Sequence, residues 1–119
     1  MNKNDLRQRT KDFALRVVRL FQSLPGSPEA AILGKQLLRC GTSVGANYRA
    51  ASLGKSPADF LAKIKICEEE ADECQYWLEL LIESGTVKPA LLAPLLQEAR
   101  ELTAIMAASA ISVRHKIRK

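Results

Sequence analysis

Acidic residues form the densest chemical cluster in the sequence, in the run Glu68-Glu69-Glu70-Ala71-Asp72-Glu73. Carboxylates this close together could hold a divalent metal. A di-iron bundle, however, needs a Glu-x-x-His motif on each of two helices. The chain has a single histidine, His115, which lies among the basic residues of the C-terminal end. The sequence therefore excludes a di-iron centre.

A magnesium site is a second interpretation, because all-α nucleotide pyrophosphohydrolases hold Mg²⁺ with acidic pairs on neighbouring helices. The chain offers the pairs Glu69-x-x-Asp72 and Glu98-x-x-Glu101. In the heptad that the neighbouring apolar residues define, Glu69, Asp72 and Glu73 fall at positions f, b and c, away from the core. A charge run on a helix usually reports solvent exposure. We favour a solvated or intersubunit acidic face and keep a Mg²⁺-dependent hydrolase as an alternative.

Catalytic nucleophiles have no base beside them in this sequence. His115 is too isolated to favour a Ser/His or Cys/His arrangement. Gly41 and Gly45 lie inside a helical pattern without a following Lys-Ser/Thr, so they do not form a phosphate-binding loop. We therefore expect no enzymatic activity, no metal and no cofactor.

The three cysteines fit buried thiols in a reducing compartment. Cys67 and Cys74 are seven residues apart, which places them ~10 Å apart along a helix, beyond the ~7 Å limit for a disulfide. Cys40 is alone in sequence, and the chain has no CxxC motif for zinc. Cysteine is among the most often buried residue types.

Basic residues are the remaining functional signal, since the net charge is +5 and the pI is near 9.3. Arg9 and Arg16 share one lane of the first helix, with Arg7 and Lys11 close by. Four more cations end the chain: Arg114, Lys116, Arg118 and Lys119. Clustered Lys and Arg are typical of phosphate contacts, which bind nucleic acid without reading its sequence. We assign Arg9, Arg16 and the four terminal cations to a nucleic-acid-binding surface.

Charge is also segregated along the chain. The segment from Pro57 to Gly85 contains eight acidic residues and two lysines, so its net charge is −6. Since the whole chain carries +5, the rest of the chain carries +11. This pattern favours pairing within or between subunits. We expect Arg49, which points out of the core, to pair with Glu69, Asp72 or Glu73 of its own or a neighbouring subunit.

Four helices account for the apolar periodicity. The first three are predicted over residues 5–24, 29–53 and 57–84, separated by Leu24-Pro25-Gly26-Ser27-Pro28 and Gly54-Lys55-Ser56-Pro57. The fourth follows Pro89, buries Leu91, Leu95, Ala99, Leu102, Met106, Ser109 and Val113, and frays from Arg114. Short connections between four helices predict an all-α, antiparallel, up-down-up-down bundle.

Two glycines suggest a close helix contact. Gly41 and Gly45 are four residues apart on one face of the second helix, and each costs up to ~1 kcal/mol of helix stability relative to alanine. We expect a tight approach at this face, with Trp77 as the covering side chain.

The length of 119 residues fits one domain, 1–119, with enough core to fold without a metal or disulfide. The polar start MNKNDLRQRTKDF predicts no secretory signal. The longest stretch free of formal charge, residues 102–113, is 12 residues long, whereas a membrane span needs ~20. We expect a soluble, cytoplasmic protein with no membrane partner.

Three segments, Arg39–Ala51, Ser56–Phe60 and Glu69–Leu81, carry a family resemblance. They resemble the four-helix-bundle family encoded by intervening sequences of bacterial large-subunit rRNA genes, related to the accessory variability protein of diversity-generating retroelements. The resemblance implies a left-handed bundle, assembly as a homo-oligomer, often a pentameric ring, and no enzymatic activity. It also implies RNA or DNA and a reverse transcriptase as partners, as in the retroelement relatives.

The function we predict is a non-enzymatic, homo-oligomeric bundle that presents positive charge to RNA or DNA. One alternative is a structural or protein-interaction module whose charge is incidental. The other is the Mg²⁺-dependent nucleotide pyrophosphohydrolase.

Overall fold

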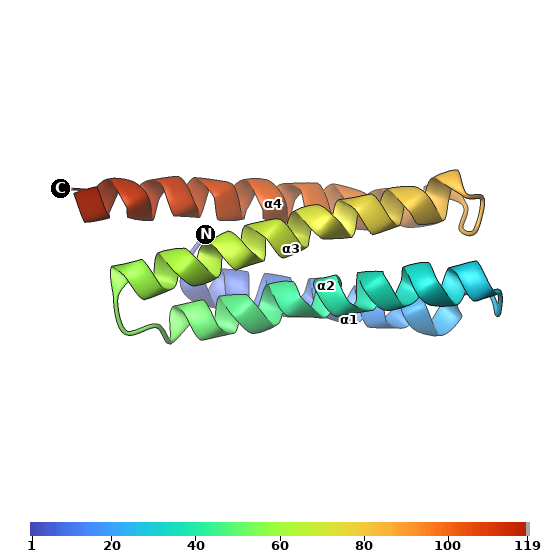
Figure 1. Cartoon of the computed structure of the whole chain (residues 1–119), viewed down its shortest axis with the longest axis horizontal. Coiled ribbons are helices and arrows are strands. Elements are labelled where there is room, and N and C mark those ends of the chain that lie inside the picture. The colour runs from blue at the N-terminus through green and yellow to red at the C-terminus, as the bar shows by residue number, and fades with distance from the viewer. Residues whose placement is uncertain (119) are drawn as a thin grey trace.

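In the computed structural model of the chain, residues 1–118 are described and form four helices joined by short turns. Their bounds are α1 Lys3–Ser23, α2 Pro28–Ser52, α3 Pro57–Glu83 and α4 Pro89–Arg118. Successive helices run in opposite directions along one long axis (Figure 1). The expected all-α four-helix bundle is confirmed, and α1, α2 and α3 begin and end within two residues of their predicted bounds.

Side-chain caps explain where the first three helices begin. The side-chain oxygen of Asn2 accepts a hydrogen bond from the Asp5 backbone N–H at 2.9 Å, and the Asn2 backbone N–H donates to the Asp5 carboxylate at 3.3 Å. This reciprocal pair starts α1 two residues before its predicted bound. Ser27 and Ser56 cap α2 and α3 in the same position, each followed by a proline whose missing N–H is not needed there.

The core pattern is most regular on α3. Six of its residues are buried at alternating spacings of three and four: Ile64, Cys67, Ala71, Cys74, Leu78 and Leu81. Buried side chains from all four helices join them in one hydrophobic core. No helix within residues 1–118 has a stretch both long and apolar enough to cross a membrane.

The buried face of α4 differs from the predicted one at both ends. Leu91 is 70% exposed and Leu92 is buried instead, because Leu92 lies three and four residues before Leu95 and Leu96, which are both buried on the same face. Near the other end Ala110 is buried and Ser109 only half-buried. The predicted fraying is also wrong, since α4 remains helical through Arg118.

The first and fourth helices share far fewer contacts than the other three neighbouring pairs. The two helices also differ in length, since α1 has 21 residues and α4 has 30, or about 31 and 45 Å at 1.5 Å per residue. The last turns of α4 extend beyond the start of α1 (Figure 1). The bundle therefore has one sparsely packed side, with an uncovered end.

The glycines of α2 lie against α1. A Cβ on Gly41 would come within 2.9 Å of the Val17 side chain, and a Cβ on Gly45 within 3.3 Å of the Thr10 carbonyl oxygen. Both distances are shorter than ordinary van der Waals contact. Trp77 is not among the atoms nearest to either glycine; its indole N–H donates to Glu73 at 2.8 Å on α3 itself. The close approach is present, but the covering element is α1 rather than Trp77.

Candidate nucleic-acid interface

Arg9 lies at the sparse side of the bundle, where it binds two carboxylates of α4. Its guanidinium donates to both oxygens of Glu98 at 2.7 Å and to Glu101 at 3.0 Å. The side chains of Arg9 and Glu98 are only 23% and 17% exposed. Hydrogen bonding to Glu98 raises the pKa of Arg9 further above its ordinary value. This internal pairing makes Arg9 a poor phosphate contact, contrary to its predicted place in the site.

The same contact engages one of the two acidic pairs considered for magnesium. Glu98 and Glu101 hold an arginine, and hydrogen bonds from Gln97 and then Arg9 lower the pKa of Glu101. The other pair, Glu69 and Asp72, lies exposed on α3. Within residues 1–118 no group of three histidine, cysteine or acidic side chains is placed to hold a metal ion.

The acidic face of α3 pairs with Arg39 rather than with Arg49. The Arg39 guanidinium donates to Glu70 at 3.3 Å and also to Glu73. Within the described part of the chain, no carboxylate forms an ion pair with Arg49. The structure therefore brings Glu73 to an arginine ten residues away from the predicted one, and leaves Glu69 and Asp72 exposed.

A cationic groove runs between α1 and α2 on the other side of α1. It has a volume of about 520 Å³, and small residues including Ala14, Gly45 and Ala46 line it together with polar and cationic side chains. The cations are Arg7, Lys11 and Arg49, and no carboxylate contributes to the lining.

None of the three groove cations is neutralised by an ion pair within residues 1–118. Lys11 and Arg49 are exposed and Arg7 is half-buried. Asp12, one residue beyond Lys11, accepts a hydrogen bond from Gln8 at 2.8 Å. A phosphate group binds where hydrogen-bond donors and positive charge are present and no carboxylate competes for them. Three cations around a floor of small residues meet these conditions.

The remaining predicted contacts do not join this groove. Arg16 lies half-buried two helical turns beyond Arg9 on the same lane of α1. Arg114, Lys116 and Arg118 are on the last turns of α4, where Lys116 shares a cavity lining with Lys3 at the start of α1. Lys119 lies outside the described residues. The predicted basic surface is thus divided among separate places on the molecule.

The cysteines are buried and free of disulfides. Burial raises the pKa of the Cys67 thiol to about 12, and the hydrogen bond to Cys40 together with burial raises that of Cys74. Thiols with raised pKa values are weak nucleophiles at neutral pH. Cys40, alone in sequence, has its sulfur 3.2 Å from that of Cys74 across the α2–α3 contact. Spacing along the sequence relates Cys67 to Cys74 but gives no sign of this pair, because Cys40 and Cys74 lie on different helices.

Comparison with known proteins identifies the family. The model of the 23S rRNA-intervening sequence protein family matches residues 2–118. The chain belongs to this family. A crystal structure of a protein of unknown function from the S23 ribosomal protein family of Bacteroides thetaiotaomicron is similar in fold, with a TM-score of 0.85 and 34% sequence identity over 92% of this chain and 98% of that one. No curated protein matches the chain. The resemblance predicted from the sequence is therefore confirmed.

Proposed function

We propose that this member of the 23S rRNA-intervening sequence protein family binds RNA or DNA through phosphate contacts in the α1–α2 groove. The observation that carries the proposal is the set of Arg7, Lys11 and Arg49 around one groove without a carboxylate in its lining. The positive net charge of +5 adds a long-range attraction to any polyanion. Binding through phosphates alone is indifferent to base sequence.

The proposed activity is binding rather than catalysis. The acidic pair Glu98 and Glu101 is engaged by Arg9, and raised pKa values disfavour the thiolate forms of Cys67 and Cys74. These observations support a non-enzymatic protein over a Mg²⁺-dependent nucleotide hydrolase.

Self-association forms part of the same proposal. On α3 the acidic side chains Glu69 and Asp72 are exposed near Ile66 and Tyr76, which are 40% and 56% exposed. An exposed aromatic and an exposed aliphatic side chain can form the core of a contact between copies of the chain, with the carboxylates at its polar rim. A homo-oligomer, for which five subunits are the expectation, would repeat the groove and add avidity to modest contacts.

The test of nucleic-acid binding uses two variants matched in charge. The groove variant carries Arg7→Gln, Lys11→Gln and Arg49→Gln. The control variant carries Arg19→Gln, Lys35→Gln and Lys88→Gln, three exposed cations that have no ion pair within residues 1–118 and do not line the groove. Fluorescence anisotropy with labelled single-stranded RNA and duplex DNA at low salt gives the dissociation constants.

We expect the groove variant to bind at least tenfold more weakly than the control variant, since each lost charge-assisted contact is worth roughly 1 kcal/mol or more. Equal weakening would show that only net charge matters. Absence of binding by the wild type would reject the proposal in favour of a protein-interaction module. Deleting residues 114–119 tests the terminal cations separately.

Self-association is tested by light scattering. Glu69→Lys with Asp72→Lys should lower the oligomer mass, whereas Asp12→Lys with Glu29→Lys, at exposed positions on α1 and α2, should not. If the two double variants have the same mass, the α3 face is not the contact.

A further inference from the structure

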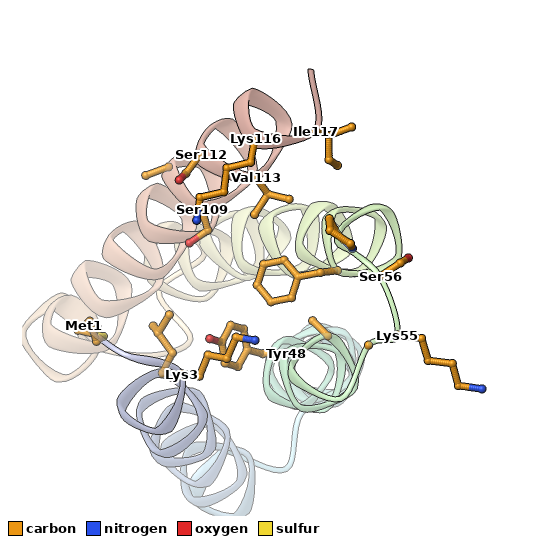
Figure 2. Close-up of a pocket in the computed structure, with 16 residues that line it drawn as sticks. Met1, Lys3, Tyr48, Lys55, Ser56, Ser109, Ser112, Val113, Lys116 and Ile117 are labelled. Carbon is orange, nitrogen blue, oxygen red and sulfur yellow. The ribbon is translucent and has the colours of Figure 1, made fainter. Parts of the chain in front are cut away.

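A second cavity lies at the uncovered end of the bundle, where the last turns of α4 pass beyond the start of α1. Its volume is about 780 Å³, and it is lined by residues from all four helices and from the turn between α2 and α3. Leu6, Phe60, Val113 and Ile117 give it an apolar wall. Figure 2 shows these helix ends around an open space. The size is within the range of roughly 300–1,000 Å³ that small-molecule pockets have.

Tyr48 lies at the base of this cavity with an unused hydroxyl. The side chain is 2% exposed, and no hydrogen bond within residues 1–118 reaches its oxygen. Every side-chain nitrogen or oxygen that is sealed from solvent in the described residues has a partner, so the Tyr48 hydroxyl must reach open space. In Figure 2 it points toward the gap between α1 and α4, beside Lys3.

Because the Tyr48 hydroxyl reaches the cavity and has no hydrogen-bond partner within residues 1–118, it is free to bond to water or to a ligand. Burial also raises the pKa of Tyr48, so the hydroxyl is protonated at neutral pH and can donate. The cavity therefore offers a hydrogen-bond donor among apolar side chains.

The charge around the cavity is positive. Lys3 and Lys116 line it from α1 and α4, and no aspartate or glutamate contributes to the lining. Lys55 also belongs to the lining but points away from the cavity in Figure 2. The Lys3 ammonium lies 5.2 Å from the centre of the Phe60 ring, so a cation and an aromatic face meet at the opening.

We propose that this cavity binds a small aromatic anion. The carboxylate or phosphate of the ligand accepts hydrogen bonds from the Tyr48 hydroxyl and the ammonium groups of Lys3 and Lys116. Its ring packs against Phe60, Leu6 and Val113. Neither an uncharged aromatic molecule nor an inorganic anion would use both features of the cavity.

The test is a titration of the ¹⁵N-labelled protein followed by chemical-shift changes. The probes are 2-naphthoate, adenosine monophosphate and the uncharged 2-naphthalenemethanol. We expect 2-naphthoate to bind saturably with a dissociation constant of about 1 mM or below, with shifts centred on Tyr48 and Ser109. The uncharged probe should bind at least tenfold more weakly. Tighter binding of the monophosphate than of naphthoate would identify a phosphate ligand, and the reverse a carboxylate ligand.

Matched variants locate the contacts. Tyr48→Phe keeps the ring and removes the hydroxyl, and Lys3→Gln with Lys116→Gln removes the two charges; each should weaken naphthoate binding roughly tenfold. Lys35→Gln, near the start of α2 at the other end of the bundle, should leave it unchanged. If Tyr48→Phe does not fold, the lysine variant decides.

Three results would overturn the proposal: no saturable shifts around the cavity, equal binding of the charged and uncharged probes, or equal binding by the lysine variant and Lys35→Gln. The variant Arg7→Gln, Lys11→Gln and Arg49→Gln should bind naphthoate like the wild type. Failure of this proposal therefore leaves the nucleic-acid proposal untouched.

Discussion

Arg7 and Arg9 lie two residues apart on α1, and their surroundings differ completely. Arg9 faces α4 and donates to the carboxylates of Glu98 and Glu101. Arg7 lines the groove toward α2, where the lining contains no carboxylate. The comparison shows that the neighbouring helix, more than local clustering in sequence, decides whether a basic residue is available to a phosphate.

The two sides of α1 also differ in how they are held. Toward α2 the backbones approach closely at Gly41 and Gly45, so packing holds that side. Toward α4 the helices share few contacts, and the ion pairs of Arg9 link them. The charge of Arg9 therefore helps to hold α4, whereas no ion pair within residues 1–118 neutralises the charge of Arg7.

The largest effect is expected from overpacking the α2 side. Gly45→Leu would force a side chain against the backbone of Thr10, which cannot move aside as a side-chain end can. We expect a loss of about 1–3 kcal/mol in the free energy of unfolding. Gly41→Leu, against Val17, should be similarly destabilising.

The control is Gly26→Leu, because no atom lies within 4 Å of a Cβ at that turn position. Its effect should stay within about 0.5 kcal/mol. Urea titrations that gave Gly45→Leu and Gly26→Leu the same stability would contradict the close α1–α2 packing.

On the α4 side, Arg9→Met should reduce stability by roughly 1–2 kcal/mol, because it leaves Glu98 without its charged partner in a partly buried position. Replacing Glu98 by methionine in the same protein should recover part of the loss. Additive effects of Arg9→Met and Glu98→Met in a double-mutant cycle would show that the pair is not coupled.

Arg39→Met sharpens the comparison with a smaller effect. The Arg39 side chain is 51% exposed, and exposed ion pairs typically contribute about 0–1 kcal/mol. We expect thermal melts to give Arg39→Met a clearly higher melting temperature than Arg9→Met. Equal losses would mean that burial does not distinguish the two arginines.

Acid should weaken the α4 side in a way that depends on Arg9. Hydrogen bonds from Gln97 and then Arg9 lower the pKa of Glu101 below its ordinary 4.5. The ionised form is therefore favoured in the folded state, and its contribution is lost as the pH falls below about 4.5 through the lowered pKa. Urea midpoints measured from pH 7 to pH 3 should fall more steeply for the wild type than for Arg9→Met. Parallel curves would remove Arg9 from this dependence.

Local signals predicted most of the fold. Each of these signals depends only on residues close together in sequence. They are the prolines and glycines of the turns, the serine caps, and the three-four alternation on α3. The leucine pairs 91–92 and 95–96 fit two phases of the helix, so the sequence pattern alone does not decide between Leu91 and Leu92; the structure buries Leu92.

The candidate site was harder to predict, because it depends on which helices meet. Counting in opposite directions from the short turn after α2 would have placed Arg39 opposite Glu70 and Glu73, as observed. The turn therefore carried a usable signal. No such local signal relates α1 to α4, which meet only in the folded bundle, so the pairing of Arg9 could not be derived from spacing alone.

The salt dependence of nucleic-acid binding tests the central difference between Arg7 and Arg9 most directly. Each phosphate contact contributes about −0.9 to the log–log slope on duplex DNA and about −0.7 on a single strand. The variant lacking Arg7, Lys11 and Arg49 should therefore have a slope shallower by about 2–3 on duplex DNA, while the variant lacking Arg19, Lys35 and Lys88 and the single variant Arg9→Gln stay near the wild type. Equal slopes for the groove variant and the wild type, or an equal change on removing Arg9, would contradict the account.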